Sequence, residues 1–181
     1  MTDHSITERF VGTSSFGSIA GATYPDLDNE VGRTRRMLEI FPDGQNDWRP
    51  HEKSTGLAQL ASHVAELPMF ATAIVTTDSM DFMKGEYVSH SCGSRADLLD
   101  LFDSSVESLR AALAAADAES LARPWTLRKG DYVIVTGPRG ELMREVALNH
   151  MVHHRAQLGV YYRMLGVPLP GLYGPSADEA L

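Results

Sequence analysis

The strongest constraint on the fold is one uninterrupted helical period in the segment SRADLLDLFDSSVESLRAALAAAD, residues 94–117. Its apolar side chains recur three or four positions apart: Leu98, Phe102, Val106, Leu109 and Leu113. Because an α-helix has about 3.6 residues per turn, these side chains share one face. Ser94 directly precedes the pattern and is a favourable N-cap residue. The segment therefore predicts a long amphipathic helix that must bury one face against other elements.

Three further segments have helical spacing. YPDLDNEVGRTRRMLEIF predicts a first helix beginning at Pro25 and Asp26. A second helix is expected to be capped by Ser54 or Thr55 and to end near residue 77. A last helix is expected from near residue 138 to residue 165. Four amphipathic helices of this length predict an all-α fold, a four-helix bundle.

One segment departs from the helical pattern. PWTLRKGDYVIVTGPRG contains two short runs rich in β-branched and aromatic residues around Gly130, which predicts a short hairpin or extended excursion before the last helix. Residues 1–24 are rich in Ser, Gly and Thr and show no sustained period, so we expect an N-terminal arm followed by one bundle domain over residues 25–181.

Charge and motifs narrow the function classes. The 24 acidic residues outnumber the 16 basic ones, giving a net charge of −8 that repels phosphate backbones and anionic lipid, so nucleic-acid and membrane partners are not expected. No basic segment followed by an apolar core opens the chain, which predicts a cytoplasmic protein. The single cysteine, Cys92, excludes an internal disulfide and lies in a loop-like stretch where we expect no catalytic role. Dinucleotide-binding, P-loop, zincin and nucleophile-elbow motifs are absent from the sequence.

Histidines gather in LNHMVHHRAQL, which contains His150, His153 and His154. At about 100° per residue, His154 lies about 40° from His150, and His153 about 60° away on the other side. We compared these angles with those of the surrounding apolar residues. His150 and His154 lie near the middle of the inward-facing stripe, and His153 lies at its margin. Arg155 is expected to face outward. The same count turns His63 inward on the second helix.

Two interpretations of these inward histidines stay open. Each unpaired buried polar group costs about 1 to 3 kcal/mol, and one shared metal ion would satisfy three imidazoles while leaving coordination positions free, as in catalytic sites. Alternatively, each ring is an ordinary core histidine bonded to a carbonyl or carboxylate. Glu66 suits either case, as a simple partner of His63 or as a group that orients a ligand. Tyr161 either donates into the cavity or packs in the core, and Pro68 predicts a local kink.

A family resemblance favours the metal interpretation. DWRPHEKSTGLAQLASHVAELP and LNHMVHHRAQLGVYYRMLGVPLPGLYGPSADE resemble the DinB/YfiT-like superfamily of bacterial four-helix-bundle proteins, over roughly residues 25–179. In that superfamily one histidine on the second helix and an H-x-x-x-H pair on the fourth form a metal triad. The resemblance maps this triad onto His63, His150 and His154 and implies one divalent transition metal, zinc or nickel first among them.

The resemblance also suggests a chemistry. Relatives include transferases that use low-molecular-weight thiols such as bacillithiol or mycothiol, so the chain resembles a metal-dependent transferase acting on a small electrophilic substrate. Alternatives are a metal-dependent hydrolase, in which the ion activates water, and a non-catalytic metal-binding stress-response protein. No acid or base can be named from the sequence. Relatives are often dimers, so a homodimer is also implied by the resemblance.

Overall fold

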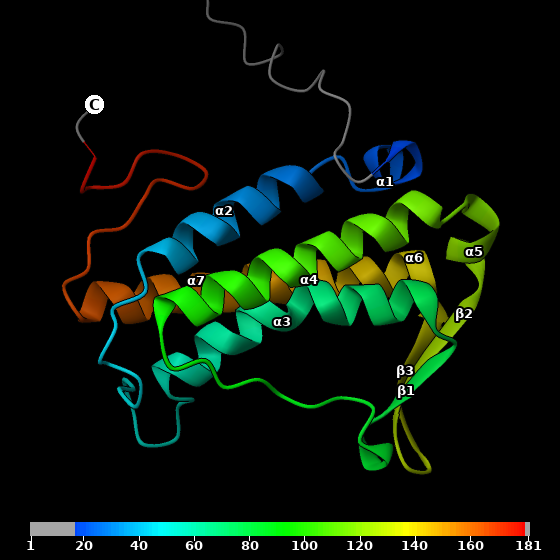
Figure 1. Cartoon of the computed structure of the whole chain (residues 1–181), viewed down its shortest axis with the longest axis horizontal. Coiled ribbons are helices and arrows are strands. Elements are labelled where there is room, and N and C mark those ends of the chain that lie inside the picture. The colour runs from blue at the N-terminus through cyan, green and yellow to red at the C-terminus, as the bar shows by residue number, and fades with distance from the viewer. Residues whose placement is uncertain (1–16, 180–181) are drawn as a thin grey trace, which may run out of the picture.

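The computed structural model describes residues 17–179. Its long helices are α2 (Leu27–Glu39), α3 (Leu57–Thr76), α4 (Arg95–Ala115) and a last continuous helix. That last helix consists of α6 (Arg139–Leu142), the π-helical segment η3 (Met143–Leu148) and α7 (Asn149–Met164). These helices lie side by side along the long axis of the molecule (Figure 1). None of the described helices has the length and apolar character needed to cross a bilayer.

The core lies between these helices. The apolar residues that predicted α4 are all buried, and α3 contributes a broad buried face that includes Leu60, Leu67, Phe70 and Ile74. The predicted hydrophobic period of α4 is therefore confirmed. The predicted arm of residues 1–24 falls largely outside the described residues, but its end forms the short helix α1 (Ser18–Thr23).

The all-α prediction is too coarse, because a three-stranded sheet closes one end of the helical layer (Figure 1). β2 (Pro124–Lys129) and β3 (Tyr132–Pro138) form the predicted antiparallel hairpin, which turns at Gly130 with φ of 59°. β1 (Ser79–Asp81) pairs in parallel with β2 and was not predicted. β1 has only three residues, which is too short for a hydrophobic period to be recognised in the sequence. It forms because β2, which is distant in the sequence, supplies its hydrogen bonds.

Several short elements connect the larger ones. The 3-10 helix η2 (Phe82–Lys84) follows β1, and the helix α5 (Ala118–Ala122) precedes β2. Between η2 and α4, the chain runs in extended form beneath α3 (Figure 1). Because it runs beneath α3, this connection, residues 85–93, is called the α3 loop from here on. It supplies contacts to the candidate site.

The helix starts are partly as predicted. Ser94 caps α4, its hydroxyl oxygen accepting from the Asp97 N–H at 3.2 Å. α3, in contrast, begins after Gly56, and neither Ser54 nor Thr55 caps it. Its first amides instead donate to backbone carbonyls of the preceding loop, Leu57 to Trp48 at 2.9 Å and Ala58 to Asn46 at 3.0 Å. Because the loop satisfies these amides, a side-chain cap is unnecessary.

Replacing Ser94 with Ala should lower the free energy of unfolding by about 1 kcal/mol, because the change removes the acceptor for the first turn of α4. Urea denaturation of both proteins measures the difference. Ser91→Ala, an exposed change in the α3 loop three residues before Ser94, is the control and should leave the midpoint of denaturation unchanged. Equal midpoints for all three proteins would show that the cap contributes nothing.

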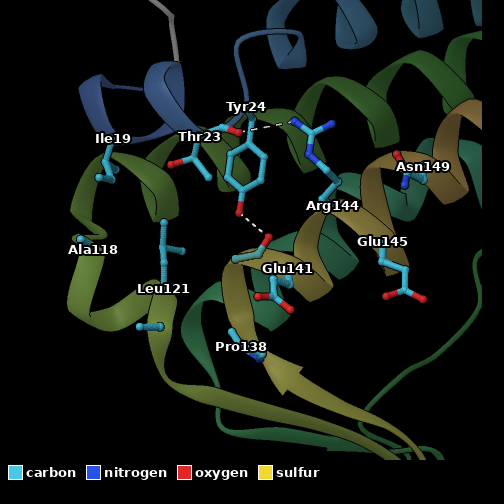
Figure 2. A pocket seen from close by; sticks show the side chains of 12 residues that line it. Ile19, Thr23, Tyr24, Ala118, Leu121, Pro138, Glu141, Arg144, Glu145 and Asn149 are labelled. Atoms are coloured by element: carbon cyan, nitrogen blue, oxygen red, sulfur yellow. Dashed lines mark hydrogen bonds between the residues drawn. The ribbon is translucent and has the colours of Figure 1, made fainter.

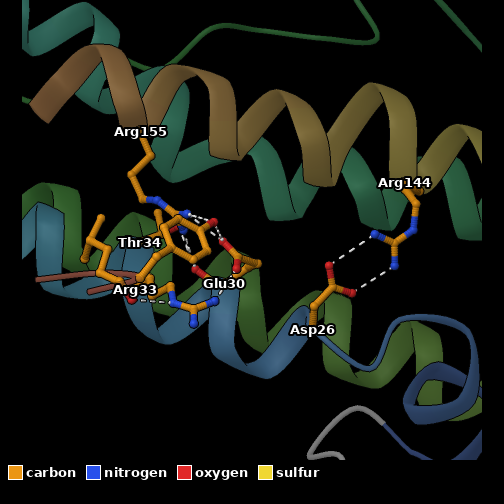
Figure 3. A network of polar contacts seen from close by, with 8 residues as sticks. Asp26, Glu30, Arg33, Thr34, Arg144 and Arg155 are labelled. Atoms are coloured by element: carbon orange, nitrogen blue, oxygen red, sulfur yellow. Dashed lines mark hydrogen bonds and ion pairs between the residues drawn. The ribbon is translucent and has the colours of Figure 1, made fainter. Parts of the chain in front are cut away.

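A buried ion pair joins α2 to α7, and here a prediction is wrong. Arg155 was expected to face outward, but its side chain is 2% exposed and donates to Glu30 Oε2 at 2.5 Å (Figure 3). It also donates to the Glu30 carbonyl and to Thr34 Oγ1. The reason is that α7 packs against α2 as well as α3, so its buried arc is wider than a single stripe and includes a polar position.

The C-terminal tail completes this network. The Tyr173 hydroxyl donates to Glu30 Oε2 at 2.7 Å and accepts from Arg155 Nη2 at the same distance. Arg33 forms an ion pair with Glu30, lies over the Tyr173 ring and donates to the Leu172 carbonyl. Burial alone would raise the pKa of Glu30, but the bonds from Tyr173, Arg155 and Arg33 outweigh it and lower the pKa. The carboxylate is therefore ionised and holds the tail against α2.

Candidate metal centre

The structure brings together the three histidines that the sequence analysis singled out. His63 comes from the first half of α3, and His150 and His154 come from the first turns of α7. The Nε2 atom of His150 lies 2.7 Å from that of His154 and 3.5 Å from that of His63. Because residues four apart on a helix share a face, α7 presents both of its rings to the single ring of α3.

The opposite nitrogen of each ring is already engaged. Each Nδ1 contacts an oxygen atom: Glu66 Oε1 at 3.0 Å from His63, the Val146 carbonyl at 3.2 Å from His150, and Gln157 Oε1 at 2.7 Å from His154. These oxygens favour the tautomer with the proton on Nδ1, and the three Nε2 atoms face one another. Three imidazole nitrogens grouped in this way can each give a lone pair to one cation, so these residues fit a bound metal ion.

The electrostatics favour the neutral rings that metal binding requires. Burial lowers the pKa of His150, and neighbouring His63 lowers it further. Burial also lowers the pKa of His154 to about 4, against an opposing effect from its bond to Gln157. Both imidazoles are therefore uncharged at neutral pH, which is the state in which histidine binds a metal.

Glu66 is the carboxylate that orients His63. Its side chain is fully buried and accepts from four donors: His63 Nδ1, the Tyr87 hydroxyl, the His90 backbone N–H at 2.9 Å and His90 Nδ1 at 3.0 Å. Burial alone would raise the pKa of Glu66, but these donors together lower it. An ionised, fully paired Glu66 therefore links the His63 ring to the α3 loop.

Two of these partners were missed from the sequence. Tyr87 and His90 lie in the α3 loop, where no helical or strand period exists to predict the direction of a side chain. Gln157 was given no role from the sequence, although its position three residues after His154 brings the two side chains into reach.

The depth of the histidines differs from the prediction. His150 and His154 were expected near the middle of the buried stripe, but both are half-buried, and His153 is exposed. The most buried arc of α7 is formed instead by Met151, Arg155, Leu158, Tyr161 and Tyr162. The histidines therefore lie at the edge of the contact between α7 and α3, and the His63 side chain is 29% exposed. A centre at this edge is open to solvent.

The π-helical segment η3 ends next to the histidine pair. The Asn149 amide donates to the Arg144 carbonyl five residues earlier, in place of the usual four. The Val146 carbonyl within this wider segment accepts from the His150 ring. Wide turns of this kind occur often at functional sites, and this one contributes an acceptor to the centre.

Three other residues considered from the sequence lie outside the centre. Tyr161 is buried, donates to the Thr55 carbonyl at 3.2 Å and packs edge-on against Trp48, so it belongs to the core. Burial raises the pKa of the Cys92 thiol, which opposes formation of a nucleophilic thiolate. α3 continues through Pro68 without interruption.

A separate cleft of about 820 Å³ lies between α1, α5 and α6 (Figure 2). Tyr24, Leu121, Glu141 and Arg144 are among its lining residues, and none of the three histidines lines it. Tyr24 crosses the cleft to donate to the Gly140 carbonyl at 2.7 Å. The cleft is therefore distinct from the histidine centre.

Fold and site together define a class of protein: a mainly helical bundle in which three histidines from two helices form a group that fits a divalent metal ion. Comparison with known proteins gives the family. The chain matches the DinB family over residues 21–180 and therefore belongs to it.

Solved structures agree with this assignment. A DinB-like protein from Bacillus subtilis has a TM-score of 0.61 at 20% identity, covering 82% of this chain and 96% of that protein. A DinB-like protein from Bacillus cereus has a TM-score of 0.63 at 19% identity, covering 83% of this chain and 95% of that one. At these identities the likeness establishes the shared fold. No curated protein matched the sequence.

Proposed function

We propose that the protein binds one divalent transition metal ion, zinc or nickel, through His63, His150 and His154. The observation that carries this proposal is the convergence of three Nε2 atoms, each on a ring whose Nδ1 is bonded to Glu66, Val146 or Gln157. Imidazole nitrogen suits both metals, so the ligand set does not separate them. Three protein ligands leave at least one position for a small molecule.

We further propose that the protein is a metal-dependent transferase that joins a low-molecular-weight thiol to a small electrophile. A divalent ion at this centre would bind a thiol as its thiolate and make it nucleophilic at neutral pH. The protein's own contribution is to hold the rings of His150 and His154 neutral and to keep the centre at the open edge between α3 and α7, where a thiol can enter. Glu66 fixes His63 from the buried side, which leaves the opposite side free for substrate.

The test combines metal analysis with turnover. Protein purified without a chelating column is analysed for metals and assayed with a chloronitroarene, in the presence and absence of small thiols, before and after chelation. We expect about one metal ion per chain and turnover that requires both metal and thiol. Absence of metal, even after reconstitution with zinc and nickel, would overturn the whole proposal.

The same assay distinguishes the alternatives. Metal-dependent hydrolysis of small esters or amides without thiol would replace the transferase with a hydrolase, in which the bound ion activates water. Stoichiometric metal with no turnover on either substrate class would indicate the non-catalytic metal-binding protein. His63→Ala protein provides the background rate, since it lacks the only ligand that α3 contributes among the described histidines.

A further inference from the structure

We infer that Tyr87 and His90 of the α3 loop position the His63 ring through Glu66, so that the loop and the metal centre stabilise each other. The inference rests on the metal binding proposed above and concerns residues outside the ligand set. His63 and Glu66 both belong to α3, whereas Tyr87 and His90 follow Glu66 by 21 and 24 positions. Their contacts with Glu66 are therefore tertiary contacts, which exist only while the loop lies beneath α3.

The loop contacts both oxygen atoms of the Glu66 carboxylate. Oε1 accepts from the Tyr87 hydroxyl and lies 3.0 Å from His63 Nδ1, so the loop and the ligand share one atom. Oε2 accepts from the His90 backbone N–H at 2.9 Å. The last torsion of a glutamate side chain has a broad energy minimum, so contacts on both oxygens are needed to fix its plane. The α3 loop therefore sets the direction in which the carboxylate meets His63.

No helix of the described chain replaces the loop in this role. Among the described residues, the hydrogen bonds of the Glu66 carboxylate come from His63 and from the α3 loop. The side chain of Glu66 is fully buried, and a buried carboxylate is costly unless its oxygens are paired. Displacing the loop removes these partners and leaves His63 without a fixed acceptor.

The coupling acts in both directions. A metal ion held by an imidazole strengthens the bond from the opposite ring nitrogen to a carboxylate. Metal on His63 therefore favours the Glu66 orientation that the α3 loop holds. By thermodynamic linkage, the loop then raises the affinity for metal by the same factor by which metal stabilises the loop.

Two backbone amides of the α3 loop allow this coupling to be measured. The His90 amide donates to Glu66, and its exchange with solvent reports directly on that bond. The Cys92 amide donates to Ser62 Oγ at 2.9 Å and has no contact with the carboxylate. The Cys92 amide is therefore an internal control within the same loop.

Amide hydrogen exchange followed by NMR tests the effect of metal on the loop. Saturating zinc should slow exchange of the His90 amide about 5- to 150-fold, the range for coupled sites, and should leave the Cys92 amide unchanged. Tyr87→Phe should speed exchange of the His90 amide with and without zinc. This variant keeps the aromatic ring, which packs edge-on against Phe70 with centroids 5.8 Å apart, and removes only the hydroxyl.

Zinc affinity, measured by competition with a chromophoric chelator, tests the effect of the loop on metal. Tyr87→Phe should weaken zinc binding about 2- to 10-fold, the net value of one hydrogen bond. Glu66→Met should weaken it about 10- to 100-fold, the usual effect of losing a partner behind a metal ligand. In the Glu66→Met background, Tyr87→Phe should have no further effect, because the hydroxyl acts through the carboxylate. Tyr132→Phe, which removes an exposed hydroxyl from β3, is the matched control and should bind zinc as wild type.

The outcomes separate this inference from the proposed function. Unchanged exchange of the His90 amide in a protein that binds zinc would overturn the inference and leave the proposed function standing. Wild-type affinity in Tyr87→Phe, or an equal loss with and without Glu66, would overturn the positioning role of Tyr87. A wild type that binds no zinc would overturn the proposed function and the coupling with it. The exchange comparison uses the wild type alone, so it decides the question even if Glu66→Met does not fold.

Discussion

Replacing His150 or His154 with Ala is expected to reduce zinc content from about one ion per chain to near background. Two imidazole ligands seldom retain a zinc ion that three ligands bind. His63→Ala should behave in the same way. His153→Ala should retain nearly full stoichiometry at saturating zinc, since its ring is exposed and its Nε2 faces Gln157 instead of the centre. Elemental analysis of the four variants, each reconstituted and desalted in parallel, makes the comparison.

The comparison also tests the assignment of the ligand pair. Loss of metal in His153→Ala together with retention in His154→Ala would show that the pair on α7 is three residues apart, and the centre described above would be wrong. Circular dichroism of each variant checks that α7 remains folded, so that a change in metal content reports on ligation.

Replacing Arg155 with Met is expected to lower the free energy of unfolding by about 3 to 5 kcal/mol, the range for removing one partner of a buried ion pair. The change takes the buried arginine away from the Glu30 carboxylate, which is 5% exposed and keeps only its contacts with Arg33 and Tyr173. Chemical denaturation of wild type and variant gives the difference. The double variant Glu30→Gln with Arg155→Met should be less destabilised than Arg155→Met alone, because the buried side chain at position 30 then carries no charge that has lost its Arg155 partner.

Arg163 offers a matched control on the same helix. It forms an ion pair with Asp178 on the surface, and Arg163→Met should therefore cost far less than Arg155→Met. Similar losses for the two variants would show that burial of the Glu30–Arg155 pair contributes nothing beyond a surface contact.

Local periodicity explains what could be predicted from the sequence. The helix that contains Leu98 and Phe102, the cap at Ser94 and the hairpin at Gly130 all depend on residues close together in the chain, and all are confirmed. The grouping of His63 with His150 and His154 followed from angles on two helices combined with a family resemblance. Each of these inferences needed only the relative directions of side chains along one element.

The wrong and missing predictions concern residues whose environment depends on a second helix, strand or loop. An angular count shows which side chains share a face, but it does not show which faces a helix buries. α7 packs against both α2 and α3, so Arg155 is buried and the histidines lie at an edge. β1 depends on pairing with β2, and the donors of Glu66 come from a loop without a period. Such features become visible only when segments distant in sequence are placed together.

The contact between Glu30 and Tyr173 also sets an order of events during synthesis. These residues are 143 positions apart, so the ribosome makes the acceptor long before the hydroxyl that bonds to it. Until the tail is made, Glu30 lacks the Tyr173 hydroxyl and Arg33 lacks the Leu172 carbonyl. The layer formed by α2, α7 and the tail therefore cannot be completed before the tail is made, whereas the hairpin of β2 and β3 needs only neighbouring residues for its pairing.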